Sequence, residues 1–424
     1  MKVERVMERV YDRRRLHQAW QSVRRNAGAA GIDQMTVADF ACREEALLDL
    51  IQAKLQAGTY RFKPARRVEI PKPGSTQKRN LGIPVVMDRI VSTSLHSVLE
   101  ELFEPDFTTS NFGFRRGKSQ HQAIGHVRQA VMEGYEWCAA IDLQGFFDEI
   151  PHDLILKLIR RKIRDERIVT LIARALKAGV MVDGVLEKTT KGCPQGSPVS
   201  PMLSNIVLNE LDHELQRRGH RYCRWADDFI ILLKTERAAR RVMESVTTFL
   251  EQNLGLPVNR DKSHVALVKD VEFLGFQILA GKIRISTQGR KRFKDQVRRL
   301  TPRNNGQSMY QIIHDLNAYL RGWVGYYRVQ EFLRVFRELD EFIRSRLRSM
   351  QLKKWKKPRK FQRMMIRAGY PVSEARRTWI KMNKWQSVMR RPVRFVLNLK
   401  WFRRQGLLFL NDFTSQTLKL EFAR

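Results

Sequence analysis

The stretch "RYCRWADDFIILLK", residues 221–234, decides how the centre of this chain folds. Its apolar run, 229–233, has the length and β-branched composition of a buried strand. Two adjacent carboxylates, Asp227 and Asp228, stand where that strand begins. Along a regular strand they would face opposite ways, because side chains alternate. In the tight turn of a hairpin this alternation lapses and both can face one place. We therefore predict a strand, a turn and a strand here.

A third aspartate has a similar setting. Asp142 follows the apolar residues 139–141, where a buried strand should end. Three carboxylates brought together would repel one another, and a divalent cation removes that cost. Mg²⁺ binds a few carboxylates together with substrate phosphates, and two such ions serve phosphoryl transfer. An isolated Asp-Asp pair is more simply a solvated turn, so the choice depends on the rest of the chain.

The charge of the chain points to a polyanionic partner. The net charge is +35, and residues 281–424 hold 36 basic against 9 acidic side chains. Aromatic residues interleave with these charges, which is typical of nucleic-acid surfaces, although a basic surface for solubility or for anionic lipid is the alternative. The four cysteines form no CxxC pair, which argues against a disulfide framework or a zinc module. Without a signal peptide or a membrane-length apolar run, we expect a cytoplasmic protein with no membrane partner.

Periodicity and turn residues predict a mixed α+β chain. Two short strands about a Pro/Gly turn and then a helix are expected within 66–91, and a buried strand at 137–141. The stretch 353–360, "KKWKKPRK", is predicted to be a linker or an exposed arm. Helices are predicted at 1–25, 38–58, 152–177, after "PQGSP", at 236–253, and through most of the chain beyond 285.

Four segments occur in a telling order: "AIDLQGFFDEIPHDLI", "GCPQGSPVSPMLSNIVLNELD", "CRWADDFIIL" and "EFLGFQI". In this order the chain resembles the reverse transcriptases, and most closely the group II intron-encoded reverse transcriptase/maturases. "NAGAAGIDQMTV" is similar to their N-terminal extension, and "IPKPGSTQKRNLGIPVVMDRIV" and "NFGFRRGKSQHQAI" to their fingers motifs. "LGLPVNRDKSHV" resembles a palm motif, and "LNAYLRGWVGYYR" the thumb. The resemblance covers essentially the whole chain.

The resemblance implies a right-hand polymerase. Fingers and palm, with a β-sheet palm, would occupy 1–285, and a helical thumb or maturase (X) domain 286–372. A small basic helical DNA-binding domain would follow at 373–424, as in short members that lack the HNH endonuclease domain. One departure is Trp225, where the family usually has Tyr before Ala-Asp-Asp. Both metal-binding aspartates remain, so the departure concerns contact with the primer end or nucleotide.

Roles carry over residue by residue. The resemblance implies that Asp142 and Asp227 hold two Mg²⁺ ions, with Mn²⁺ as an alternative, and that Asp228 assists them. Phe147 falls at the position of the sugar gate that favours dNTPs, although it could be a core aromatic, as Phe146 next to it could be. The remaining nucleotide-binding candidates are Lys72 and Arg79 for the triphosphate, and Gln195 with Gly196, where the glycine allows close backbone approach.

Other residues are expected to hold nucleic acid. "GFRRGKS" fails as an ATP-binding loop, because three residues separate its glycines where four are needed. Its arginines, Arg115 and Arg116, more plausibly touch the template backbone. The implied primer grip is a tight hairpin formed by Phe273, Leu274, Gly275 and Phe276. The basic candidates for RNA are Lys353, Lys354, Lys356 and Lys357.

The predicted activity is RNA-directed DNA polymerisation, with an RNA template, a DNA primer or target and dNTPs. The resemblance also implies binding of a group II intron RNA as a splicing maturase and support of intron retrohoming, within a nucleoid-associated ribonucleoprotein of a bacterial-type cell. Two alternatives stay open: a domesticated relative acting in DNA repair or defence, and an RNA-binding splicing cofactor only. The oligomeric state is not indicated.

Overall fold

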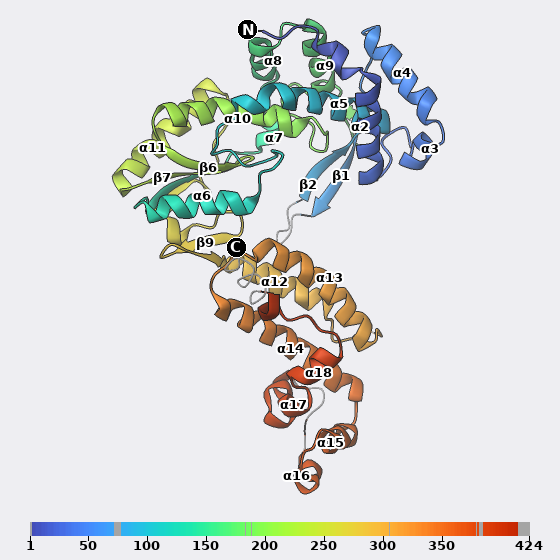
Figure 1. Cartoon of the computed structure of the whole chain (residues 1–424), viewed down its shortest axis with the longest axis vertical. Coiled ribbons are helices and arrows are strands. Elements are labelled where there is room, and N and C mark those ends of the chain that lie inside the picture. The colour runs from blue at the N-terminus through green and yellow to red at the C-terminus, as the bar shows by residue number, and fades with distance from the viewer. Residues whose placement is uncertain are drawn as a thin grey trace. The chain divides into compact units, whose positions relative to one another are not determined.

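The chain divides into two compact units, Met1–Leu274 and Gly275–Arg424 (Figure 1). The computed structural model describes residues 2–71, 78–182, 184–187, 189–304, 306–378, 380 and 385–413. This division falls close to the predicted boundary at 285. It assigns residues 373–424 to the second unit, so a separate C-terminal domain stays a prediction. In the described ranges, no helix is both long and apolar enough to cross a bilayer.

The centre of the first unit is an antiparallel sheet with the strand order β6-β7-β3-β8. The predicted hairpin is confirmed: β6 is Arg221–Trp225 and β7 is Asp228–Leu233. Strand β3, Trp137–Ile141, lies between β7 and β8, His264–Leu267. Helix α11, Glu236–Thr248, packs on β3, β7 and β8. Helices α6, Gln120–Met132, and α10, Ser200–Arg217, pack against β6 (Figure 1).

A second sheet of the first unit has the order β2-β1-β4-β5. Strands β1, Ala65–Pro71, and β2, Lys78–Ile83, are antiparallel, and helix α5, Val86–Phe103, follows them. This is the predicted succession of two strands and a helix. Strand β4, Val180–Val182, runs parallel to β1 and pairs with β5, Val185–Glu187. The short helices around these sheets are η1, Glu104–Asp106; α7, Phe146–Glu149; α8, His152–Lys162; and α9, Glu166–Leu176.

Two of the predicted helices are each split into two in the structure. The expected helix 1–25 is α1, Val6–Val10, and α2, Arg13–Asn26, because the Asp12 side chain accepts the Arg15 amide and starts α2. The expected helix 38–58 is α3, Val37–Ala41, and α4, Glu44–Gln56. Helices α2 and α3 meet where Trp20 and Phe40 lie 4.4 Å apart between ring centroids.

The second unit is helical, as predicted, after the hairpin of β9, Phe276–Leu279, and β10, Lys282–Ile285. The predicted linker at 353–360 is wrong, because buried rings of Trp355 and Phe361, 5.7 Å apart, fix this stretch as the end of one helix and the start of the next. The helices of the unit are α12, Thr287–Leu300; α13, Met309–Tyr327; α14, Leu333–Trp355; α15, Pro358–Arg367; α16, Val372–Arg377; η4, Trp385–Met389; α17, Arg391–Val396; and α18, Leu399–Arg404.

Candidate active site

The sheet register brings the three predicted aspartates to one edge. Strand β3 pairs with β7 antiparallel, and the last pair is Ile141 with Phe229. Asp142 is the next residue after β3, and Asp228 is the first residue of β7, so both stand at the same end of neighbouring strands. Asp227 directly precedes Asp228. It lies in the two-residue turn between β6 and β7, which is closed by the pairing of Trp225 with Asp228. The topology therefore provides the gathering of carboxylates that the sequence suggests.

The three side chains do not form one tight cluster. Among the described residues, the group of three acidic or histidine side chains whose ligand atoms all lie within 4.8 Å of one another is His17, Glu44 and Glu45. The aspartates are thus more widely spread than a single ion requires. Three hard oxygen donors at a half-exposed edge do suit Mg²⁺, which keeps water and phosphate ligands beside a few carboxylates.

Asp142 is held by a loop within the stretch LGLPVNRDKSHV, which resembles a palm motif but for which no contact with this aspartate was predicted. Its amide donates to Ser263 Oγ at 3.0 Å, and its carbonyl oxygen accepts the Asn259 amide at 2.8 Å. The next residue bridges to Val258, so the loop runs alongside the end of β3. Lys262 Nζ lies 3.6 Å from the Asp142 carboxylate, whose side chain is 36% exposed. The loop therefore fixes the backbone of Asp142 and adds one positive charge beside it.

The predicted gate residue lies on the short helix α7. Gly145 begins this helix in the left-handed region, with φ 56°, directly after the strand-end aspartate loop. Phe146 is 3% exposed and belongs to the core, as the sequence allowed. Phe147 is partly buried and packs edge-to-face on Phe146 at 5.3 Å and on Phe114 at 6.5 Å. Phe114 itself is 47% exposed, with a positive φ of 56°.

The loop with the sequence PQGSP is fastened to β2. The Gly82 amide donates to the Gln195 carbonyl at 2.7 Å. A Cβ on Gly196, whose φ is +111°, would lie 2.2 Å from the Gly82 carbonyl oxygen. The backbone of Gly196 therefore lies in close contact with the backbone of Gly82 in strand β2, which only a glycine permits. The Gln195 side chain reaches the Asp148 carboxylate, at 3.3 and 3.4 Å, and burial raises the pKa of Asp148.

A hollow of about 270 Å³ opens between this loop and the β1–β2 hairpin. It is lined by polar and charged groups, among them Arg67, Asn80, Asp148, Lys191 and Gln195. Lys72, predicted to bind triphosphate, lies outside the described residues. Arg79 lies on β2 opposite Ile70, and its side chain is not among those described.

The two arginines after Gly113 differ in their surroundings. The side chain of Arg115 is only 7% exposed and donates to Glu104 at 2.7 and 2.9 Å and to the carbonyl oxygens of Thr108 and Asn111 at 2.6 and 2.7 Å. Its donors are thus directed at protein groups, which disfavours the predicted template contact. Arg116 is exposed, so contact with the template backbone stays a prediction for this residue.

The predicted primer grip spans the division between the two units. Phe273 and Phe276 are buried, at 7% and 1% exposed, while Leu274 and Gly275 form a turn with φ of 51° and 78°. The predicted tight turn is present, although the paired hairpin β9–β10 follows it instead of containing it. Within the second unit, a Cβ on Gly275 would lie 2.7 Å from the Tyr327 hydroxyl.

The four lysines predicted to bind RNA lie about the junction of α14 and α15. Lys353, Lys356 and Lys357 are exposed. Lys353 and Lys354 contact Asn304 and Gln307 respectively, and burial lowers the pKa of Lys354. Lys356 and Lys357 thus offer the more open charges.

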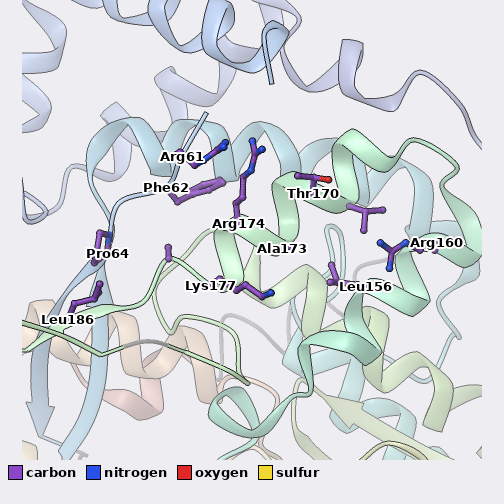
Figure 2. Close-up of a pocket in the computed structure, with 12 residues that line it drawn as sticks. Arg61, Phe62, Pro64, Leu156, Arg160, Thr170, Ala173, Arg174, Lys177 and Leu186 are labelled. Carbon is purple, nitrogen blue, oxygen red and sulfur yellow. The ribbon is translucent and has the colours of Figure 1, made fainter. Parts of the chain in front are cut away.

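Another basic hollow of the first unit was not predicted. It measures about 590 Å³ between α8, α9 and the segment before β1 (Figure 2). Four cations line it beside Phe62: Arg61, Arg160, Arg174 and Lys177. Arg160 is paired with Glu166 at 2.9 Å, and Arg174 donates to the Gly58 carbonyl at 2.7 Å.

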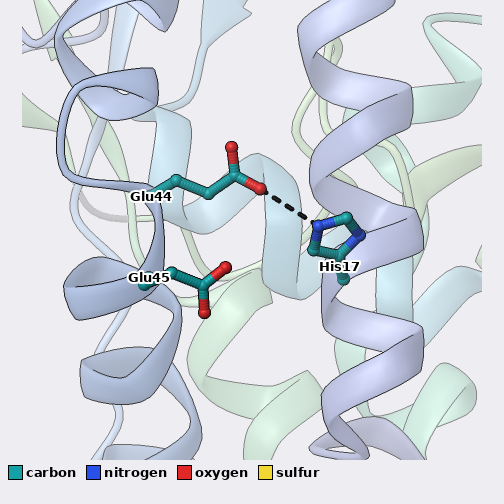
Figure 3. Close-up of side chains that lie close together, drawn as sticks. All are labelled: His17, Glu44 and Glu45. Atoms are coloured by element: carbon teal, nitrogen blue, oxygen red, sulfur yellow. Dashed lines mark ion pairs between the residues drawn. The ribbon is translucent and has the colours of Figure 1, made fainter.

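The tight cluster of His17, Glu44 and Glu45 joins α2 to α4 (Figure 3). His17 Nε2 lies 3.1 Å from Glu44 Oε1, and Glu45 is paired with Arg13. These contacts account for the cluster as ion pairs between two helices.

Two family models and several known proteins match this chain. Residues 70–278 match the family model "Reverse transcriptase (RNA-dependent DNA polymerase)", and residues 290–368 match "Group II intron, maturase-specific domain". The chain is 32% identical to Protein YkfC of Escherichia coli, over 61% of this chain and 78% of that protein. The chain belongs to the group II intron-type reverse transcriptase/maturases. Its polymerase family uses divalent metal ions, and its maturase-specific domain implies a nucleic-acid partner.

One more distant relative by sequence is consistent with this membership. The reverse transcriptase/maturase is 29% identical to the Group II intron-encoded protein LtrA of Lactococcus lactis, over 65% of this chain and 57% of that protein. It thus spans little more than half of LtrA. A telomerase structure from Candida tropicalis has a TM-score of 0.43 at 13% identity, covering 53% of this chain and 55% of that one, which is too distant to argue from.

Proposed function

We propose that this reverse transcriptase/maturase extends a DNA primer along an RNA template with dNTPs, at a site where Asp142, Asp227 and Asp228 hold two Mg²⁺ ions, with Mn²⁺ as an alternative. Such ions, when bound, lower the pKa of the primer hydroxyl and neutralise charge on the phosphates. The observation that carries the proposal is the register of β3 against β7, which sets Asp142 and Asp228 at one sheet edge beside the turn of Asp227.

The other site residues act by position in this proposal. The loop 258–263 holds Asp142 through its backbone, which keeps one carboxylate fixed while substrates change. Phe147, braced by two rings, excludes a 2′-hydroxyl and so favours dNTPs. Gln195 and Gly196 set the wall next to the nucleotide, and Lys72 and Arg79 neutralise the triphosphate.

The test is primer extension by purified protein on an annealed RNA template and DNA primer with Mg²⁺. The wild-type protein should yield cDNA, and Asp227→Ala should lower the rate by at least about 10³-fold while RNA affinity stays within about threefold. Asp153→Ala, which removes an exposed carboxylate of α8, is the matched control and should polymerise normally. Wild-type synthesis by Asp227→Ala would show that the site assignment is wrong.

We propose further that the basic second unit grips intron RNA and supports its splicing, and that synthesis and RNA binding together support retrohoming. The excess of 36 basic over 9 acidic residues in 281–424 supports this, as does the exposure of Lys356 and Lys357. The hollow beside Phe62 gives a second basic surface (Figure 2). A protein that acts on intron RNA and on chromosomal DNA would be found where both are present. We therefore propose that it forms a nucleoid-associated ribonucleoprotein in the cytoplasm of a bacterial-type cell.

Splicing of the cognate intron at low Mg²⁺ tests the maturase role, since it should depend on added protein. Asp227→Ala should still support splicing, because RNA binding does not use that carboxylate. Absence of any protein dependence would remove the maturase role and favour a domesticated enzyme acting in DNA repair or defence. Splicing support by a wild-type protein without any cDNA synthesis would favour the RNA-binding cofactor.

A further inference from the structure

A buried arginine lies next to the turn that carries Asp227. The side chain of Arg224, on β6, is 0% exposed, and so is its partner Asp212 on α10. Arg224 Nε donates to both oxygens of Asp212, at 2.9 and 3.0 Å, and a terminal nitrogen donates at 2.5 Å. One side of the guanidinium is thereby fixed to α10.

The other branch of the guanidinium reaches the turn itself. Arg224 Nη1 donates to the Ala226 carbonyl oxygen at 3.0 Å and to Asn205 Oδ1 at 3.0 Å. Ala226 has a φ of 58°, in the left-handed region, which costs a residue other than glycine about 1 kcal/mol. The carbonyl of Ala226 belongs to the peptide that leads into Asp227. Its orientation therefore sets the direction from which the Asp227 side chain leaves the turn.

The same cluster holds the turn from a second side. Asn205 Nδ2 donates to the Gly113 carbonyl at 2.9 Å, and the Phe112 amide donates to the Arg224 carbonyl at 2.9 Å. A Cβ on Gly113 would lie 2.1 Å from the Ala226 nitrogen, so the two backbones are in close contact. The turn is clamped between β6, α10 and the segment 110–113.

A buried ion pair is a costly way to stabilise a fold. Removing two charges from water costs several kcal/mol, and apolar residues of similar volume often replace such pairs without loss of stability. The planar guanidinium of Arg224 has five donors in fixed directions, so it can bind a carboxylate, an amide oxygen and a backbone carbonyl oxygen at once. Apolar residues cannot make these contacts.

We infer that Arg224 is a positioning residue: with Asp212 and Asn205 it fixes the Ala226 carbonyl and thereby aims Asp227 at the sheet edge shared with Asp142. This inference rests on the proposed polymerase function for its effect on rate. The claim that Arg224 fixes the conformation of the turn does not depend on the polymerase function, and it can be tested without substrates.

Two variants separate positioning from stability. Arg224→Met with Asp212→Leu removes both charges together, so its melting temperature should stay within a few degrees of wild type. Arg224→Lys keeps the charge opposite Asp212 and loses the fork. Tyr60→Phe is the matched control, since it removes a buried 2.7 Å hydrogen bond to Asp88 elsewhere in the first unit.

The first measurement is hydrogen exchange of the amides of 225–228 in protein without metal or substrate. We expect at least about tenfold faster exchange in both Arg224 variants and no change in Tyr60→Phe. The second measurement is primer extension. Displacing the turn by about 1 Å should lower kcat between about 10- and 100-fold, with the KM for dNTP and the Kd for RNA within about threefold.

Wild-type exchange and wild-type kcat in a folded double variant would overturn the inference, because the cluster would then serve stability alone. If the double variant does not fold, Arg224→Lys decides by the same two measurements. If the wild-type protein does not polymerise, the proposed function fails, and exchange of the turn amides still confirms or refutes the clamp.

Discussion

Gly113→Ala should impair catalysis although it adds a single methyl group far from Asp227 in the sequence. The added Cβ would lie 2.1 Å from the Ala226 nitrogen, 2.9 Å from the Trp225 carbonyl carbon and 3.0 Å from the Ala226 Cα. All three atoms are backbone, so no side chain can rotate away. The φ of Gly113 is not positive, which means that alanine meets no strain of its own there.

The size of the effect follows from this overlap. Ordinary contact with a Cβ begins near 3.4 Å, so the turn or the segment 110–113 must move by more than 1 Å. Overpacking of this kind costs about 1–3 kcal/mol of folding free energy. Displacement of a catalytic group by about 1 Å lowers rates by about 10²-fold. We therefore expect kcat to fall by about two orders of magnitude in protein that is still folded.

Thermal melts and single-turnover primer extension on an RNA template would measure the two effects separately. Gly125→Ala is the matched control, because Gly125 lies within α6 and nothing lies within 4 Å of its added Cβ. That variant should be equally active and about 1 kcal/mol more stable. A folded Gly113→Ala enzyme with the wild-type rate would refute the claim that this contact sets the position of the turn.

Three further predictions follow from other parts of the molecule. Phe147→Val should raise the use of rNTPs by at least about tenfold in assays where rNTPs compete with dNTPs. Phe114→Ala, which removes only the outer ring packed on Phe147, should have a smaller effect in the same direction. Unchanged selectivity in Phe147→Val would show that Phe147 is not the sugar gate. Burial raises the pKa of Asp340 from 3.8 to about 6. The second unit should therefore lose about 1–3 kcal/mol of stability as the pH rises from about 4 to 7, because the carboxyl must ionise in its buried position. Thermal melts of Asp340→Asn should lack this pH dependence even if that variant is less stable at every pH. Replacing Lys356 and Lys357 together by Gln should weaken RNA binding and reduce the slope of log K against log salt by about 1.4, whereas an unchanged slope would show that neither lysine contacts phosphate.

The central sheet could be predicted because its signals are local. The run 229–233 is apolar and β-branched, and the two aspartates before it mark where the strand begins. The linker predicted at 353–360 was wrong because charge outnumbers apolar residues there. Only tertiary contacts show that Trp355 and Phe361 carry that stretch into the core.

The strand ends that carry the three aspartates were predictable from the sequence, whereas the contacts that hold them in place were not. Asp142 and Asp227 are marked by the ends of strands, which sequence patterns locate. Their supports come from distant segments. Ser263 and Asn259 hold the backbone of Asp142, whereas Asn205 and Asp212 bind Arg224, and Gly113 lies against Ala226 in the turn before Asp227. One signal was available, namely an arginine between Cys223 and Trp225, near the end of the strand that leads into the hairpin turn. A charge in that place needs a buried partner, although the sequence does not say which one.

The same supports bear on Trp225, which stands where the family usually has Tyr. The backbone of Trp225 is fixed by its pairing with Asp228 across the hairpin, and Arg224 before it is anchored to α10. Neither constraint depends on the ring. Exchanging one aromatic side chain for another at this position therefore leaves the carboxylate-bearing backbone where it is, and changes only the surface that the ring offers to a primer or nucleotide. The proposed metal binding and the aromatic contact are thus separable in this hairpin. The backbone of β6 and the buried Arg224 hold the turn that carries Asp227, whereas the contact depends on the partly exposed side chain of Trp225.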